Sequence, residues 1–294
     1  MGWGFKMGEL PAYENISARH ARTSSFGLAW RVGLLLGMTF CGFAAAQGTG
    51  GIHPALTDKW NFQLGAYRPK VETTAFLNSS AGARGTQLSF EDDLGFDDSK
   101  TVPAFLAAVR LGERWKIEFE YLSLSRDNSR AINKNINWGD RSYTIGTVVN
   151  SDFDSDIYRL SGGYSFIKTN QAELGVSLGL HLTDFSLSLS ASGVGGQKAD
   201  ALAPLPTIGL YGAYAIDSKW LVSGRLDYFS LNYGDYDGHL TNFTAGVDYR
   251  FTRNFGVGVA YRYIDYDVTV TKTSFNGGAE YKFSGPMLYV NASF

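Results

Sequence analysis

Cysteine is almost absent from this sequence. Cys41 is the only one among 294 residues, and it lies inside an apolar N-terminal run that we expect to be removed. The mature chain would then hold no cysteine, which excludes disulfide bonds and thiolate metal sites. Phe40 precedes Cys41 at a position where a lipidation signal needs a small residue, so we expect no lipid anchor.

Long hydrophobic runs and an excess of basic charge are missing too. The longest apolar run, residues 32–46, is shorter than the roughly 20 residues that a spanning helix needs. The mean hydropathy of −0.13 is too low for a bundle of membrane helices. Outside residues 1–46 the chain has 22 basic and 26 acidic residues. This acidic balance argues against nucleic acid as a partner.

The order of residue types near the start predicts a signal peptide. Arginines precede the apolar run 32–46, and Ala44, Ala45 and Ala46 supply the small residues that a signal peptidase needs. We expect 1–46 to be the signal peptide and 47–294 to be one mature domain. The arginines are Arg19, Arg22 and Arg31.

Two alternatives stay open for this N-terminal segment. The stretch before Arg31 is long for a signal peptide, so the start could be assigned too far upstream, with Met7 as one other start. A buried core helix over residues 26–46 is the second alternative.

The mature chain does show an alternation of residue types with a period of two. In segment 255–263 aromatic and β-branched residues alternate with small or charged ones, and strands place successive side chains on opposite faces. A soluble sandwich alternates in the same way. The charged residues sit among small ones on the second face, as in a membrane barrel that has lipid outside and charges in the lumen. We therefore predict an all-β fold, an antiparallel transmembrane β-barrel.

About ten strands are expected, with eight or twelve as alternatives. An even number places both ends of the chain on the periplasmic side. A hairpin above the membrane, or a further strand pair, is possible within residues 129–150. The expected spans are 59–69, 102–111, 115–126, 153–167, 171–184, 204–216, 219–232, 239–251, 255–271 and 276–294.

The connections are predicted to alternate between short periplasmic turns and longer extracellular loops. The longer polar connections are 71–101, about 126–152, 190–203, 233–238 and 271–276. Aromatic residues beside the short turns are expected to form one interfacial girdle: Trp60, Trp115, Phe166, Trp220, Phe251, Phe255 and Phe294. The other girdle is expected from Tyr121, Tyr158, Tyr228, Tyr261 and Tyr263.

Charged residues on the inward face nearly balance in sign. Opposite charges in a narrow lumen should pair, because an unpaired buried charge is costly. We therefore predict an ion-paired lumen and a narrow or closed pore. The predicted set is Arg110, Lys116, Glu118, Glu120, Arg159, Glu173, Arg225, Asp227, Asp248, Arg250 and Arg262. Arg225, Arg250, Arg262, Asp227 and Asp248 come from consecutive strands and are expected to pair with one another.

The chain ends in a strand with a terminal aromatic residue. Leu288, Val290 and Ala292 alternate before Phe294, and this pattern resembles the C-terminal signature of Gram-negative outer-membrane barrel proteins. The resemblance covers residues 59–294 and implies an outer-membrane location. It also implies transient recognition by the outer-membrane assembly machinery, and contact with outer-membrane lipid and lipopolysaccharide. Ala292 departs from the signature, where a larger apolar residue is commoner. The oligomeric state stays open.

Two constellations resemble those of barrel enzymes. Asp237-Gly238-His239 resembles the Asp-x-His pair of omptin proteases, with Asp152, Asp154 and Asp156 as a second acidic group, although a plain turn is the preferred interpretation because Asp-Gly is a turn dipeptide. Ser177 and His181 share a face, as in an outer-membrane phospholipase, but no third group is apparent.

A dense acidic run could bind a hard cation such as calcium. Its carboxylates are Glu91, Asp92, Asp93, Asp97 and Asp98, but their spacing matches no defined calcium loop, and a solvated loop is the alternative.

We expect a structural or narrow-pore outer-membrane barrel without catalysis, cofactor or metal. The alternatives are a surface hydrolase of omptin type and an adhesin-like barrel that binds through its long loops.

Overall fold

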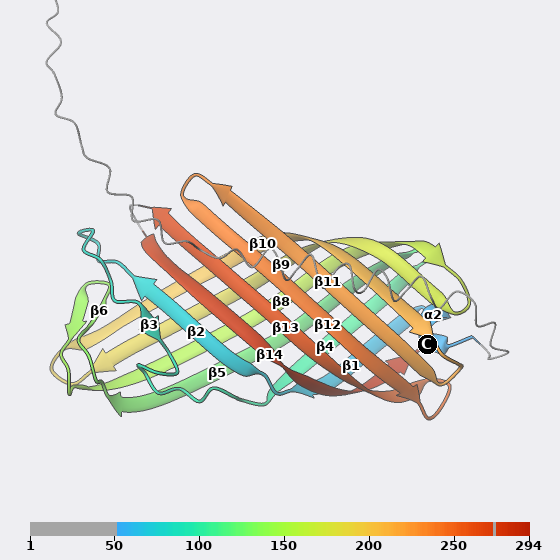
Figure 1. Cartoon of the computed structure of the whole chain (residues 1–294), viewed down its shortest axis with the longest axis horizontal. Helices are drawn as coiled ribbons and strands as arrows, with labels where there is room; N and C mark the ends of the chain where they lie inside the picture. The colour runs from blue at the N-terminus through green and yellow to red at the C-terminus, as the bar shows by residue number, and fades with distance from the viewer. Residues whose placement is uncertain (1–51, 273–274) are drawn as a thin grey trace, which may run out of the picture. The chain divides into compact units, whose positions relative to one another are not determined.

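The computed structural model describes residues 52–272 and 275–294. The predicted signal peptide, residues 1–46, lies outside this part of the chain. The described residues form one large antiparallel sheet that closes on itself, a short helix before it and a separate two-stranded hairpin (Figure 1). No described helix is long and apolar enough to cross a membrane.

The helix and the strands, in chain order, are α2 (Pro54–Thr57), β1 (Trp60–Tyr67), β2 (Lys70–Leu77), β3 (Leu88–Ser89), β4 (Val102–Leu111), β5 (Trp115–Ala131), β6 (Ile136–Trp138), β7 (Arg141–Tyr143), β8 (Val148–Lys168), β9 (Ala172–Ala191), β10 (Gly195–Ala215), β11 (Trp220–Tyr233), β12 (Tyr236–Arg250), β13 (Phe255–Lys272) and β14 (Phe275–Ser293).

Ten strands form the closed wall in the described part of the chain. Its order is β1, β4, β5, β8, β9, β10, β11, β12, β13 and β14, and β14 pairs with β1 to complete the ring. Strand β2 continues β1 beyond Arg68 and Pro69 and pairs with the first half of β14. The ten-stranded barrel predicted from the sequence is confirmed.

Three stretches that were predicted as connections contain strands. Residues 71–101 include β2 and β3, residues 126–152 include the ends of β5 and β8, and residues 190–203 include the tight hairpin between β9 and β10. The outward residues of these stretches are polar, so the alternation of apolar and polar residues that marks a membrane-spanning strand is weak. For this reason the strands within them were not predicted. The hairpin predicted within 129–150 is present as β6 and β7.

One end of the barrel carries the short turns and the C-terminus, on the right in Figure 1; we call it the periplasmic end. Toward this end the outward side chains are apolar and exposed, as lipid contact requires. Leu178, for example, is 70% exposed. The aromatic residues predicted for the girdle beside the short turns, Trp60, Trp115, Phe166, Trp220, Phe251, Phe255 and Phe294, are all exposed.

The interior changes character along the barrel. Strands β8, β9 and β10 have 20 or 21 residues, about twice the 9–11 that a spanning strand needs. Near the periplasmic end their inward residues are polar or charged. Farther along, the inward residues join one large apolar core that includes Leu124, Phe153 and Leu187. We call this part the extracellular half.

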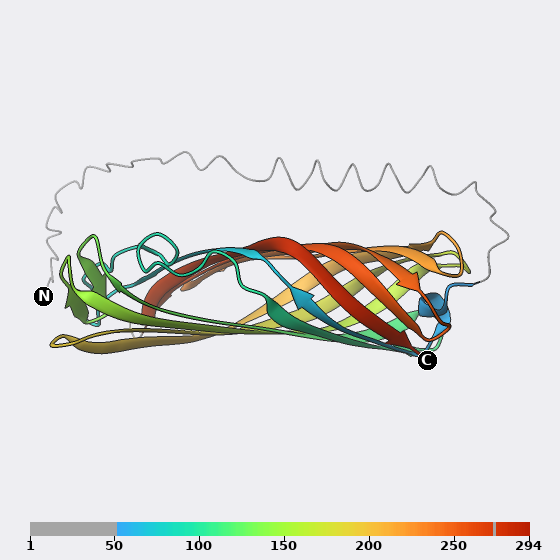
Figure 2. The same cartoon turned by 90° about the horizontal axis from the view of Figure 1, so that it is seen from below.

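Helix α2 lies at the same end of the barrel as the C-terminus (Figure 2). Leu56 is buried against Ala215 and Leu221, and Lys168 donates a hydrogen bond to the carbonyl of Leu56. Asp58, which follows the helix, accepts two hydrogen bonds from Arg253 (2.8 and 2.6 Å) and one from Ser293 (2.6 Å). The helix is thus fastened to two turns and to the last strand.

Candidate functional site in the barrel lumen

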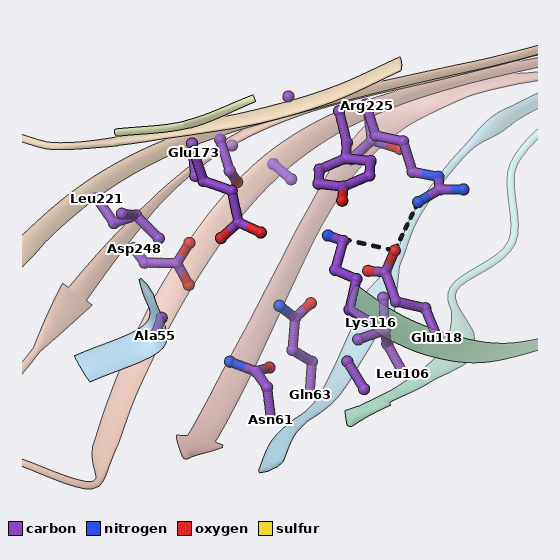
Figure 3. A pocket seen from close by; sticks show the side chains of 18 of the residues that line it. Ala55, Asn61, Gln63, Leu106, Lys116, Glu118, Glu173, Leu221, Arg225 and Asp248 are labelled. Carbon is purple, nitrogen blue, oxygen red and sulfur yellow. Dashed lines mark hydrogen bonds and ion pairs between the residues drawn. The ribbon is translucent and has the colours of Figure 1, made fainter. Parts of the chain in front are cut away.

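A cavity of about 200 Å³ lies in the periplasmic half of the lumen. The inward phase of the strands brings ten of the eleven predicted charged residues to its lining, and Asp227 is fully buried beside them. Figure 3 shows Lys116 and Glu118 of β5, Glu173 of β9 and Arg225 of β11 converging on this space. Ala55 of α2 also contributes to the lining.

Glu120 is the centre of the first ion-paired group. Arg159 of β8 approaches it with Nε and Nη2, each at 2.8 Å. Arg262 of β13 reaches the other carboxylate oxygen from farther around the wall. Both guanidinium groups are almost fully buried. Because one carboxylate serves two buried cations, this group joins β5, β8 and β13 across the lumen.

Glu118 and Asp227 form a second group around Arg225. Arg225 contacts Glu118 at 2.6 Å and Asp227 at 2.7 Å, and Lys116 adds a contact to Glu118 at 3.4 Å. The dashed lines in Figure 3 mark the contacts of Glu118. Asn242 donates a hydrogen bond to Asp227 and accepts one from Arg262, so the second group is linked to the first.

Glu173 organises a third group near the periplasmic end. Arg110 donates to both of its carboxylate oxygens (3.0 and 2.8 Å), a two-pronged geometry that fixes the pair well. Lys168 reaches the same carboxylate at 2.7 Å. Ser165, which donates to Glu173, also shares a hydrogen bond with Tyr211. The sequence reasoning missed Lys168 because it lies at the end of a strand, among turn residues.

Aromatic rings occupy lumen space beside glycines. A Cβ atom on Gly175 would lie 2.4 Å from the Tyr211 ring, and one on Gly258 would lie 2.3 Å from the Tyr289 ring. Lys116 also lies 3.6 Å from the centre of the Tyr211 ring, a favourable cation–aromatic contact. The small residues of the alternating pattern therefore make room for rings from other strands.

Arg250 and Asp248 do not pair as the sequence predicted. Arg250 donates to the carbonyl of Asn254 at 2.8 Å, while Asp248 accepts from Asn291. No ion pair joins either residue to the network in the described chain. Arg250 and Asp248 lie on one face of β12. The prediction failed because the Arg250 side chain extends toward the loop after β12, where it meets Asn254, and away from Asp248.

The comparison with known proteins comes mainly from structure. No profile of a known protein family matches this sequence, and no curated protein matches it. The Escherichia coli outer membrane protease OmpT superimposes with a TM-score of 0.56 at 12% identity, over 85% of this chain and all of that one. The fold is that of a Gram-negative outer-membrane β-barrel.

Two other solved barrels match less well. The translocator domain of the autotransporter NalP from Neisseria meningitidis has a TM-score of 0.41 at 14% identity and covers 92% of this chain and 98% of its own. The P. putida toluene transporter TodX has a TM-score of 0.33 at 10% identity, covering 82% and 92%. An outer-membrane location is consistent with this fold and with the exposed apolar belt.

The enzyme-like pairs are not assembled in this outer-membrane barrel. Asp237 and His239 lie in β12, not in the turn that the sequence predicted, and His239 packs against the Tyr228 ring. Asp152, Asp154 and Asp156 lie on β8, which does not adjoin β12 in the ring. Asp152 and Asp154 are exposed, and Asp156 accepts a hydrogen bond from the Tyr121 hydroxyl at 2.9 Å.

Ser177 and His181 also bind elsewhere. Ser177 accepts a hydrogen bond from Arg225 at 3.1 Å. His181 lies 3.7 Å from Asp227 and 3.4 Å from the Tyr266 hydroxyl. Both residues belong to the lumen network of the barrel, not to a serine–histidine pair.

Carboxylates of the acidic run contact separate protein partners. Within the described residues, no group of three or more His, Cys, Asp or Glu side chains is placed to hold a metal ion. Glu91 pairs with Arg126 at 2.6 Å, and Asp93 pairs with Lys134 at 2.6 Å. Asp92 accepts from Ser89, while Asp97 and Asp98 contribute their backbone carbonyls, to Arg126 and Val71. The sequence did not indicate these ion pairs, because Arg126 and Lys134 lie 35 and 41 residues from their acidic partners along the chain.

The loop at 90–101 instead ties two parts of the outer-membrane barrel wall together. Strand β4, which lies between β1 and β5, begins at Val102. Past this end of β4, no strand of the described sheet pairs with both β5 and β2. Arg126 of β5 bridges this split by binding Glu91 of the loop and Thr73 of β2 (2.7 Å). Asn128 and Arg130 add hydrogen bonds to loop carbonyls. We call this set of contacts the acidic suture.

Proposed function

We propose that this chain is a structural outer-membrane barrel whose lumen is closed to hydrophilic solutes. The observation that carries the proposal is the linked ion-pair network, which joins β4, β5, β8, β9, β11 and β13 across the periplasmic half of the lumen. Ten strands enclose less space than the 16–18 of open porins, and helix α2 adds to the blockage. The proposal includes no catalytic step.

Conductance in planar bilayers tests this function. We expect the wild-type protein to give no porin-like current steps, because charged side chains and α2 fill the passage. Replacing Arg110, Lys168 and Glu173 together by alanine should introduce measurable steps, and it removes all three charged side chains of the third group at once. The matched control replaces the exposed pair Lys198 and Asp200 by alanine. Large wild-type conductance, unchanged by the lumen substitutions, would overturn the proposal.

We further propose that the assembly machinery recognises β14 through its outward residues. Leu288, Val290 and Phe294 are exposed, and the backbone of Phe294 pairs with Trp60 (2.9 and 3.0 Å). Phe294→Ala keeps this backbone pairing, so we expect it to lower the outer-membrane yield in cells several-fold while refolding in detergent is little changed. Phe255→Ala, which removes the ring that packs on Phe294, is the control. Equal yields for the two variants would count against recognition.

A further inference from the structure

A second cavity, of about 500 Å³, lies in the extracellular half. Its volume falls within the roughly 300–1,000 Å³ range of small-molecule sites. Unlike the cavity in the lumen network, it is lined almost entirely by apolar side chains. These include Phe90, Phe153, Phe185, Leu205, Phe229 and Tyr281.

An unfilled apolar space of this size is unusual inside a protein. Interiors are normally packed as densely as organic crystals, and each lining atom that faces a void loses its contacts on that side. Water gains little there, because a bound water needs two to four polar partners. The cavity therefore suits an apolar occupant better than solvent.

The backbone pairing of the barrel wall is interrupted beside this cavity. Backbone pairing between β10 and β11 ends at Ile208 and Tyr228, although β10 continues to Gly195 and β11 to Tyr233. Beyond the last pair β10 is joined only to β9, and β11 only to β12. The β9–β10 hairpin and the β11–β12 hairpin project in different directions in Figure 1. We call this interruption the β10–β11 gap.

Residues on both sides of the gap line the cavity. Pro204 and Leu205 contribute from β10, and Phe229 and Leu231 contribute from β11. Pro204 and Pro206 have no N–H group to donate across the gap, so the strand ladder cannot continue past them. The interruption of the strand ladder therefore lies directly beside the cavity.

The outer surface around the gap is apolar. Leu202 is 64% exposed and Ile208 is 68% exposed on β10. The gap starts at Tyr228, an exposed residue of the kind that anchors at a membrane interface. The gap thus lies at the outer boundary of the lipid, where hydrocarbon chains are available.

Two polar features restrict the occupant. Trp138, which is 2% exposed, lines the cavity, and its Nε1 donor finds no hydrogen-bond partner among the described residues. A buried donor without a partner costs free energy, so an acceptor on the ligand would be favourable. Within the part of the chain that the structure describes, Asp237 is the one charged residue of the lining, and it would repel a carboxylate. A neutral group such as an ester meets both conditions.

We propose that the cavity binds a hydrocarbon chain with a neutral ester group, admitted through the β10–β11 gap. The ester carbonyl accepts from Trp138, and the chain lies among the phenylalanine rings. Both a free alkyl ester and an acyl chain of a membrane lipid have this chemistry. The site is separate from the lumen network, so the proposal stands whether or not the lumen conducts ions.

Quenching of Trp138 fluorescence tests the site. Every other tryptophan is replaced by phenylalanine, and protein purified from outer membranes is titrated in detergent with methyl 11-bromoundecanoate. A parallel titration uses methyl 2-bromoundecanoate, whose bromine lies next to the ester and so beside Trp138. We expect saturable quenching that is stronger with the 2-bromo than with the 11-bromo ester, and that methyl undecanoate reverses at a lower concentration than undecane does. Ala203→Phe and Ala279→Phe, which fill the cavity, should each weaken binding at least tenfold. Ala245→Phe is the control outside the cavity lining, and heat-modifiable gel migration confirms that each variant is folded.

The second arm of the experiment tests the entrance and the source of the chain. Oxidising the pair Pro206→Cys and Ser230→Cys, which would cross-link the gap at its start, should slow quenching at least tenfold, and reduction should restore the rate. In nanodiscs of lipid with brominated chains, quenching that Ala203→Phe abolishes would identify a membrane acyl chain as the occupant. Quenching that does not saturate and is unchanged by both cavity-filling variants would overturn the proposal.

Discussion

Replacing Glu120 by alanine is expected to lower the free energy of unfolding by about 3–5 kcal/mol, the usual cost of removing one partner of a buried ion pair. The loss should fall at the upper end of that range, because Arg159 and Arg262 both lose their carboxylate. Reversible unfolding in guanidinium chloride, with the protein in phospholipid vesicles, measures this change.

Two control variants make the interpretation specific. Glu120→Gln keeps the shape and one acceptor oxygen, so its loss should be intermediate. Lys70→Ala removes a partner from an exposed pair with Glu72, in which both side chains are 61% exposed, and should change the free energy of unfolding far less than Glu120→Ala does. If Glu120→Ala is no more destabilising than Lys70→Ala, the lumen network does not hold the barrel together.

Replacing Arg126 by alanine is the second change with a large expected effect, again about 3–5 kcal/mol. Its guanidinium is buried and binds Glu91 and Thr73, and it lies 5.2 and 5.3 Å from the Phe96 and Phe153 rings. We expect the acidic suture to open locally. Limited proteolysis of intact cells should then cut within residues 90–101.

Arg130→Ala is the matched control for the suture, because half-buried Arg130 contributes one hydrogen bond to a neutral acceptor, the carbonyl of Asp92, and within the described residues it forms no ion pair with a loop carboxylate. It should leave proteolysis and stability almost unchanged. Equal protease resistance of the Arg126→Ala variant and the wild type would show that the loop is held in another way.

The sequence predicted which residues of each strand face inward, because alternate residues face two different environments. In β13, lipid selects Val257, Val259 and Tyr261 on one face, while the crowded lumen selects Gly258 and Arg262 on the other. The same contrast ends beyond the membrane, where water replaces lipid. For this reason the hairpin at 190–203 was mistaken for a loop.

Partners across the lumen could not be read from local spacing. Arg262 and Glu120 are 142 residues apart, and they meet only because the ring brings β13 opposite β5. Adjacent strands suggested Asp248 for this role, which was wrong. The apolar extracellular cavity was missed for a related reason: a single charged interior was assumed along the whole barrel, although Phe153 and Leu187 occupy the same inward phase as the charged residues.

The attachment of α2 to the last strand, through Asp58, has a consequence for folding kinetics. Asp58 binds Ser293, which is 235 residues away, and β1 pairs with β14 along the same edge. Bringing such distant segments together costs chain entropy before any contact compensates for it. The first and last strands should therefore meet late, and the docking of α2, which needs Arg253 and Ser293 already in place, should mark the completion of the ring.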